Sequence, residues 1–218
     1  MSATPSPLLP LPEDYADKVN ILDRMASEFF SFRDLIECGE TWSRLASGNG
    51  RIDNLPEAPE SWEALSHLAR AVLDPVWRQF GPVSLTFGFC SAALKRAIQA
   101  TPNPRISPAD DQHASCELNR RNRPVCIHRG ASCDFKVDGW EERMDEVASW
   151  VVHNLDFDAL YYYGRDRALH LSWGPKMRRM VVLMRADLET GRRRPAGTAS
   201  GESGQALFAR AILPGDST

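Results

Sequence analysis

Residues 132–137 read Ser-Cys-Asp-Phe-Lys-Val, and residues 168–173 read Ala-Leu-His-Leu-Ser-Trp. Successive side chains of a β-strand point to opposite faces, so both segments are predicted to be strands that bury one apolar face. The same alternation places Asp134 and His170 on the other face of their strands. If the two strands are neighbours in a sheet, these two side chains come within coordinating distance of one metal ion.

The flanking sequence predicts further helices and strands. An apolar stripe from Leu65 to Trp77 recurs at helical spacing, with Ser61 as the N-cap and Gly81-Pro82 as the end of the helix. Helices that precede a run of short strands indicate an α+β domain, in which helices pack on a small, mostly antiparallel sheet that carries the metal site. The remaining predicted helices are 91–99 and 139–154, and the remaining predicted strands are 83–89, 160–163 and 180–184.

Composition divides the chain into three parts. Residues 1–12 are rich in Pro and Ser and predict a disordered arm. Residues 13–188 are predicted to form a single domain. Residues 189–218 are dominated by Gly, Ser, Ala and Arg and predict a flexible tail.

Charge and cysteine content restrict the class of protein. The 218 residues are 43% hydrophobic and 25% charged, with a net charge of -3, which argues against a dominant nucleic-acid or membrane role. Local runs of arginine between residues 178 and 194 leave nucleic acid as a weaker alternative. The five cysteines and the absence of a secretory signal pattern lead us to expect a cytoplasmic protein with reduced thiols.

Four segments, in the order of the chain, resemble the M15-type zinc D-Ala-D-Ala carboxypeptidases and related endolysins, a family with the hedgehog-like DD-peptidase fold. Residues 81–98 resemble the strand, turn and helix that precede the zinc site of that family. Asp111-Gln-His113 resembles its Ser-x-His motif, residues 130–135 its Gly-x-x-x-Asp segment, and residues 169–172 its final strand. The resemblance implies that Zn²⁺ is held by His113, Asp134 and His170, with a fourth position for water.

Two alternatives for the metal ligands remain open. His113 lies farther from Asp134 than the first ligand does in the family, and His128 is the alternative first ligand. A structural zinc site of three cysteines and one histidine is the second alternative, although its spacing lacks the usual Cys-x₂₋₄-Cys pair. Its ligands would be Cys116, Cys126, His128 and Cys133.

The residues that usually carry the reaction in the family differ in this chain. Arg167 occupies the position of the general base, and Cys90 that of the arginine that steadies the oxyanion. Arginine stays protonated at neutral pH, so Arg167 can stabilise an anion but cannot accept a proton. Asp166 is then the nearest candidate base, and Asp111 and Glu117 are weaker candidates.

We therefore expect a zinc-dependent hydrolase of the M15 peptidase-like type that acts on a small peptide, amide or related conjugate. Asp166 and Arg167 are the candidate catalytic residues, and a small molecule or peptide is the expected partner. A zinc enzyme of different chemistry, in a biosynthetic or nucleotide-modification pathway, is one alternative, because a shared fold does not determine function. A non-catalytic binding module stabilised by its metal is the other.

Overall fold

A computed structural model describes residues 20–39, 42–44, 53–101, 111–187 and 193–212. Six strands form one sheet in the order β1-β2-β4-β3-β5-β6, and every neighbouring pair is antiparallel except the parallel pair β3 and β5. The strands are β1 (Val83–Phe87), β2 (Ala131–Val137), β3 (Ala159–Tyr162), β4 (Leu169–Trp173), β5 (Met180–Ala186) and β6 (Arg193–Ser200). The predicted α+β class with a mostly antiparallel sheet is confirmed.

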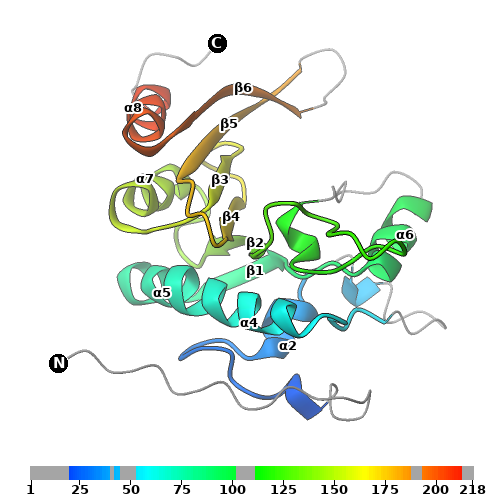
Figure 1. Cartoon of the computed structure of the whole chain (residues 1–218). Helices are drawn as coiled ribbons and strands as arrows, with labels where there is room; N and C mark the ends of the chain where they lie inside the picture. Colours follow the sequence, from blue (N-terminus) through cyan, green and yellow to red (C-terminus); the bar gives the residue numbers. More distant parts are fainter. Residues whose placement is uncertain (1–19, 40–41, 45–52, 102–110, 188–192, 213–218) are drawn as a thin grey trace.

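Helices pack against the sheet, and the short 3₁₀ turn that carries His113 contacts the central strand β2. Contacts join α4 to β2 and β4, and α8 to β5 and α7, and Figure 1 shows α5, α7 and α8 stacked along one side of the strands. The helices are α2 (Phe32–Ile36), α4 (Pro59–Leu68), the π-helical turn η1 (Ala69–Leu73), α5 (Asp74–Phe80), α6 (Ala92–Ala100), the 3₁₀ turn η2 (Gln112–Ala114), α7 (Met144–Asn154) and α8 (Gly201–Ala211).

The buried face of the central strands follows the alternation in the sequence. Cys133, Phe135 and Val137 of β2 are fully buried, as is Leu171 of the neighbouring strand β4. Side chains in between, such as Lys136, are only partly buried. The two strands therefore present one apolar face to the helices and one mixed face to the other side of the sheet.

The longest helical segment confirms the predicted apolar stripe. The segments α4, η1 and α5 follow one another without a break, and Leu65, Leu68, Val72 and Val76 are buried along them. Pro59 begins the segment, where the missing N–H of proline costs no helical hydrogen bond. Gly81 ends it with a φ of 103°, a conformation that glycine adopts without strain.

The predicted flexible tail is wrong for residues 193–212. There β6 pairs with β5 from Met180 to Ala186, and Phe208 of α8 is fully buried. Composition did not predict this structure. The segment is stabilised by hydrogen bonds to β5 and by packing on the sheet, and local sequence does not predict either of these long-range interactions. The predicted arm at residues 1–12 lies outside the described residues. Among the residues that the structure describes, no helix has the length and apolar character needed to cross a bilayer.

Candidate metal centre

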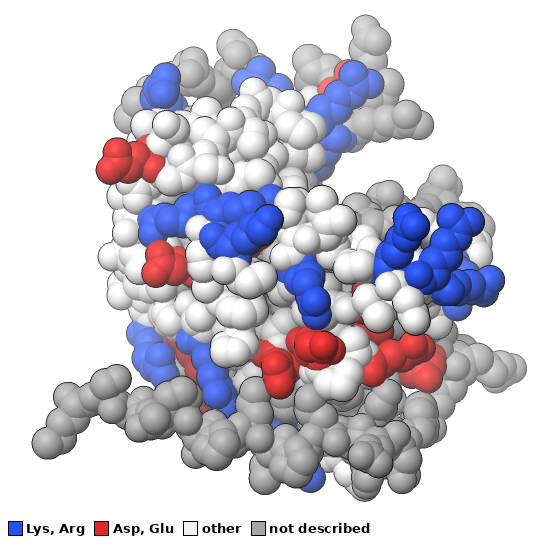
Figure 2. Space-filling view, viewed as in Figure 1, with Lys and Arg blue, Asp and Glu red and all other residues white. Residues whose placement is uncertain are grey.

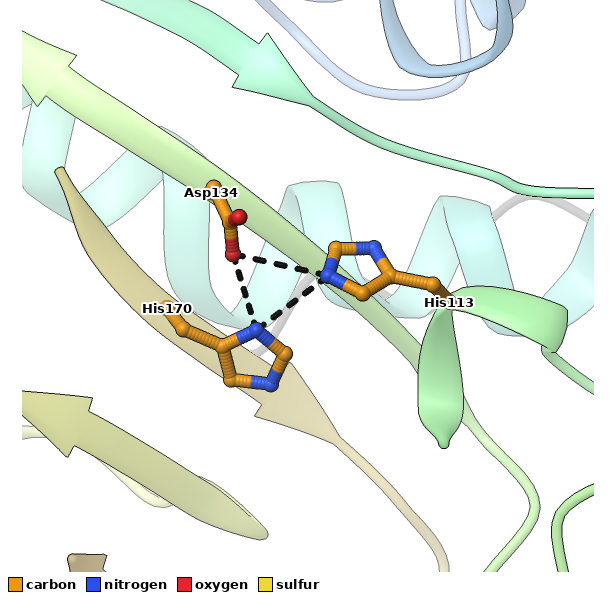
Figure 3. A group of neighbouring side chains, drawn as sticks. All are labelled: His113, Asp134 and His170. Carbon is orange, nitrogen blue, oxygen red and sulfur yellow. Dashed lines mark hydrogen bonds and ion pairs between the residues drawn. The ribbon is translucent and has the colours of Figure 1, made fainter. Parts of the chain in front are cut away.

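The three predicted ligands come from three different segments and meet on the mixed face of the sheet. Asp134 lies in the middle of β2, directly opposite His170 on the antiparallel neighbour β4. His113 belongs to η2, in the segment between α6 and β2. Figure 3 shows the two imidazole rings and the carboxylate turned toward one point.

The ligand atoms of the three side chains are close to one another. Nδ1 of His170 lies 2.8 Å from Oδ1 of Asp134, and Nε2 of His113 lies 3.4 Å from the same oxygen. The two imidazole nitrogens are 3.2 Å apart. Among the described residues, this is the one group of three or more His, Cys, Asp or Glu side chains whose geometry could hold a metal ion.

Backbone contacts fix the ring of His113. Its Nδ1 lies 2.8 Å from the carbonyl oxygen of Gly88, and its backbone N–H donates to Oδ1 of Asp111 at 3.0 Å. The carbonyl of His113 accepts from the N–H of Cys90. Because Nδ1 donates its proton to the Gly88 carbonyl, Nε2 is the nitrogen that is turned toward Asp134 and His170.

Gly88 can hold this position because it has no side chain. A Cβ at residue 88 would lie 2.1 Å from the carbonyl oxygen of Leu35, a distance that real Cβ atoms do not reach. The backbone after β1 therefore runs against the end of α2, and its carbonyl reaches the His113 ring. The sequence does not predict this role of Gly88, although residue 88 lies in the segment 81–98 that resembles the family.

The site concentrates opposite charges in a buried place. Burial disfavours the charged form of His113, but the carboxylate of Asp134 outweighs burial and raises the pKa of His113 to about 9. Burial likewise opposes the charge of Asp134, and the two histidines overcome it and hold the pKa of this carboxyl well below its usual range. The group thus favours an ionised carboxylate beside a positive charge, and a metal ion bound here would take the place of the proton on the imidazole.

A cavity of about 330 Å³ borders the ligand group. His170 lines it together with Asp111, Tyr161 and Arg178. The ring of Tyr161 meets the His170 ring edge-on, with 4.9 Å between their centroids, and the two residues are direct neighbours across β3 and β4. A molecule in this cavity would therefore lie against His170, the member of the ligand group that lines it.

The two alternative ligand sets are not assembled. His128 lies outside the group and its Nε2 is 3.3 Å from Nη1 of Arg178. The cysteines of the alternative zinc site do not gather with His128 either. Cys133 is fully buried on the helix-covered face of β2, opposite Asp134, where burial raises the pKa of its thiol well above the usual value.

The candidate catalytic residues from the sequence lie apart from the group. Asp166 and Arg167 occupy the turn between β3 and β4, where their side chains are 53% and 58% exposed and pair with each other at 3.5 Å. Cys90 is buried, and burial raises the pKa of its thiol to about 12. Glu117 accepts hydrogen bonds from the backbone N–H groups of Glu57 and Ala58, just before α4, and from the hydroxyl of Ser61. Of the carboxylates considered as bases, Asp111 is the one that lines the cavity beside His170.

Comparison with protein-family models, with curated proteins and with solved structures found no match. The geometry and the donor chemistry of the site are therefore the evidence for its function.

Proposed function

We propose that His113, Asp134 and His170 hold a zinc ion and that the chain is a zinc-dependent hydrolase of the M15 peptidase-like type, acting on a small peptide, amide or related conjugate. The observation that carries the proposal is the approach of the three ligand atoms to within 3.4 Å of one another. Two imidazoles and one carboxylate leave a fourth position open, as in catalytic zinc sites.

The spacing of the ligand atoms fits a tetrahedral ion. With zinc–ligand distances of about 2.0–2.2 Å, tetrahedral angles separate two ligands by about 3.3–3.6 Å. Of the two distances from His113 to its partners, 3.4 Å lies in this range and 3.2 Å just below it. The 2.8 Å contact between His170 and Asp134 is a direct hydrogen bond and would have to lengthen by roughly half an ångström to admit the ion.

The chain supplies the framework for hydrolysis around this ion. A bound zinc ion polarises a substrate carbonyl and makes water more acidic. The Gly88 carbonyl keeps the Nε2 lone pair of His113 directed at the site, and the strand pairing keeps His170 opposite Asp134. Oδ1 of Asp111 accepts a hydrogen bond from the backbone N–H of His113. We therefore propose that the other oxygen, Oδ2, accepts the proton of the attacking water. We place this role on Asp111 in preference to Asp166, because Asp111 lines the cavity.

Metal analysis of the purified protein tests the site. We expect about one zinc per chain in the wild type, loss of zinc in His113→Ala and His170→Ala, and full zinc content in His128→Ala, whose side chain lies outside the ligand group. A wild type that takes up no metal on reconstitution would contradict the proposal. Bound iron would instead support an oxygenase-type site, which uses the same two histidines and one carboxylate.

Hydrolysis of a panel of dipeptides and N-acyl amino acid amides tests the reaction. We expect the zinc-loaded wild type to cleave members of the panel and Asp111→Asn to lose this activity while it keeps its zinc. Asp166→Asn is the matched carboxylate control and should retain activity, because its side chain lies in the exposed turn. A fully loaded wild type that cleaves no member of the panel would favour a binding module over the enzyme.

A further inference from the structure

Arg178 is a cation held beside the ligand group by a buried carboxylate. It lies in the segment between β4 and β5 and lines the same cavity as His170. Its Nε and Nη2 donate to the carboxylate of Asp158 at 3.1 and 2.5 Å, and its backbone N–H donates to the same group at 3.2 Å. The side chain of Asp158 is 1% exposed, whereas that of Arg178 is 23% exposed.

The position of Arg178 is set from several directions. Burial works against ionisation of Asp158, but the hydrogen bonds from Arg178 prevail and lower the pKa of this carboxyl, so the carboxylate is charged at neutral pH. The residues on either side of Arg178, Met177 and Arg179, have φ values of 41° and 49°. Residues other than glycine rarely adopt this backbone conformation. Its presence on both sides of one arginine indicates that the backbone of this segment is shaped to hold the Arg178 side chain in place.

The guanidinium keeps donors available on its other edge. It has five N–H donors, and Asp158 is bound through Nε and Nη2. Nη1 lies 3.3 Å from Nε2 of His128, which also lines the cavity. A planar guanidinium edge binds carboxylates and phosphates through two parallel hydrogen bonds.

We propose that the cavity beside His170 is a subsite for an anionic group of the substrate, a carboxylate or a phosphate, which binds to Arg178 with His128 as a second polar partner. This inference rests on the proposed function, because the ligand is taken to be the substrate of the metal site. The remaining wall, which includes Tyr161 and the side chain of Ile127, 79% exposed, offers apolar surface to the rest of the ligand.

The charges around the cavity favour a ligand with one anionic group. Asp111 also lines the cavity, so a ligand with several negative charges would be repelled by its carboxylate. On a larger scale, Figure 2 shows Lys and Arg side chains on both sides of a hollow between the β5–β6 hairpin and the part of the chain that contains α6. Exposed cations gathered in this way raise the local concentration of anions.

A pair of matched ligands tests the subsite. Succinic monohydroxamate carries a hydroxamate for the zinc and a carboxylate for Arg178, and the corresponding amide has nearly the same shape without the charge. We expect the zinc-loaded wild type to bind the carboxylate compound at least roughly tenfold more tightly than the amide, because a hydrogen-bonded ionic group is lost in the amide. The phosphonate analogue, 3-phosphonopropionyl hydroxamate, shows whether phosphate or carboxylate is preferred.

Substitutions test whether Arg178 causes the preference for the carboxylate compound over the amide. Arg178→Gln should bind the carboxylate and amide compounds equally, with the affinity of the amide and the zinc content unchanged. Arg179→Gln is the control, because that guanidinium contacts Asp156 and the carbonyl of Val152, and it should keep the preference. If Arg178→Gln does not fold, Arg178→Lys takes its place and should reduce the preference, since it keeps the charge and loses the planar edge.

Two outcomes would overturn the subsite. One is equal binding of the carboxylate and the amide by the zinc-loaded wild type, and the other is a preference that persists in the Arg178 variants. Zinc content is measured first, so failure of the metal site is recognised separately. A wild type without metal would be titrated with succinate and succinamide, and only succinate should shift the NMR signals of Tyr161 and His128.

Discussion

The carboxylate of Asp134 is the centre of the ligand group, because both imidazoles approach its Oδ1. Replacing this side chain with the neutral amide in Asp134→Asn keeps its size and removes the charge. We expect the affinity for zinc to fall by more than about 100-fold, since substitutions in the shell outside the ligands already cost about 10- to 100-fold. Competition with a chromogenic chelator measures the affinity.

Asp138→Asn is the matched control for this substitution. Asp138 follows the same strand, is exposed and accepts a hydrogen bond from Ser84. Its amide variant should bind zinc as the wild type does. An Asp134→Asn variant with wild-type affinity would show that the metal, if bound, has other ligands.

Asp158 couples the stability of the fold to pH. Its folded pKa is lowered by Arg178 despite burial, so its contribution to stability is present above the unfolded pKa and is lost as the pH falls through the folded value. We expect Asp158→Asn to lower the free energy of unfolding by about 1–3 kcal/mol at pH 7, because it weakens a hydrogen-bonded ionic pair. The difference from the wild type should shrink below about pH 4, where the unfolded chain takes up a proton at this residue.

Urea unfolding of both proteins at several pH values measures this effect. A difference that stays constant from neutral to acidic pH would show that the charge of Asp158 does not stabilise the fold.

At the same scale, the sequence predicted which three side chains could come together better than which carboxylate lines the cavity beside them. Asp134 and His170 could be found because alternation places each on the face opposite buried apolar residues. His113 could be preferred over His128 only through the motif resemblance. The place of Arg178 beside the cavity could not be predicted, because it depends on a partner 20 residues away and on the shape of the intervening segment.

At the scale of single elements, strand pairing explains why a short pattern was informative. Strands β2 and β4 run antiparallel, and their register places Asp134 directly opposite His170. Alternation predicted the two faces but not this register, because a slip of two residues preserves every side chain on its face and moves the ligands apart. The helical segment from Pro59 to Phe80 was easier to predict than the strand register, because its apolar stripe is long and Gly81 marks its end.

The start of α4 depends on a carboxylate from elsewhere in the chain. Glu117 accepts from the N–H groups of Glu57 and Ala58 and from the hydroxyl of Ser61, at 2.7–3.2 Å. These donors would otherwise lack a partner at the beginning of the helix, where an anion is also favoured by the helix dipole. We expect Glu117→Ala to lower the free energy of unfolding by about 1–3 kcal/mol.

Glu146→Ala is the control for this prediction. Glu146 of α7 is exposed and pairs with Arg143, the residue just before that helix, and exposed pairs contribute less than about 1 kcal/mol. Thermal unfolding followed by circular dichroism compares the two variants. Equal losses for both would show that Glu117 does not support the helix.

At the scale of the whole molecule, the C-terminal segment decides how far the domain extends. The strand β6 completes the edge of the sheet beside β5, and α8 returns over that edge to contact α7. Gly204 of α8 approaches β6 and β5 closely, since a Cβ there would lie 3.1 Å from the carbonyl of Ala199. The domain therefore includes residues 193–212 and is not bounded at residue 188.

Phe208 tests whether this segment folds together with the rest of the chain. Its side chain is fully buried and meets the ring of Tyr162 edge-on at 5.1 Å between centroids. Truncation of a buried phenylalanine costs about 3–5 kcal/mol, so Phe208→Ala should lower the unfolding midpoint of the entire protein in one cooperative transition. Arg210→Ala, at an exposed position of the same helix, should change stability by less than about 0.5 kcal/mol. A Phe208→Ala variant that unfolds like the wild type would mean that the C-terminal segment adds nothing to the stability of the sheet, as its composition alone suggests.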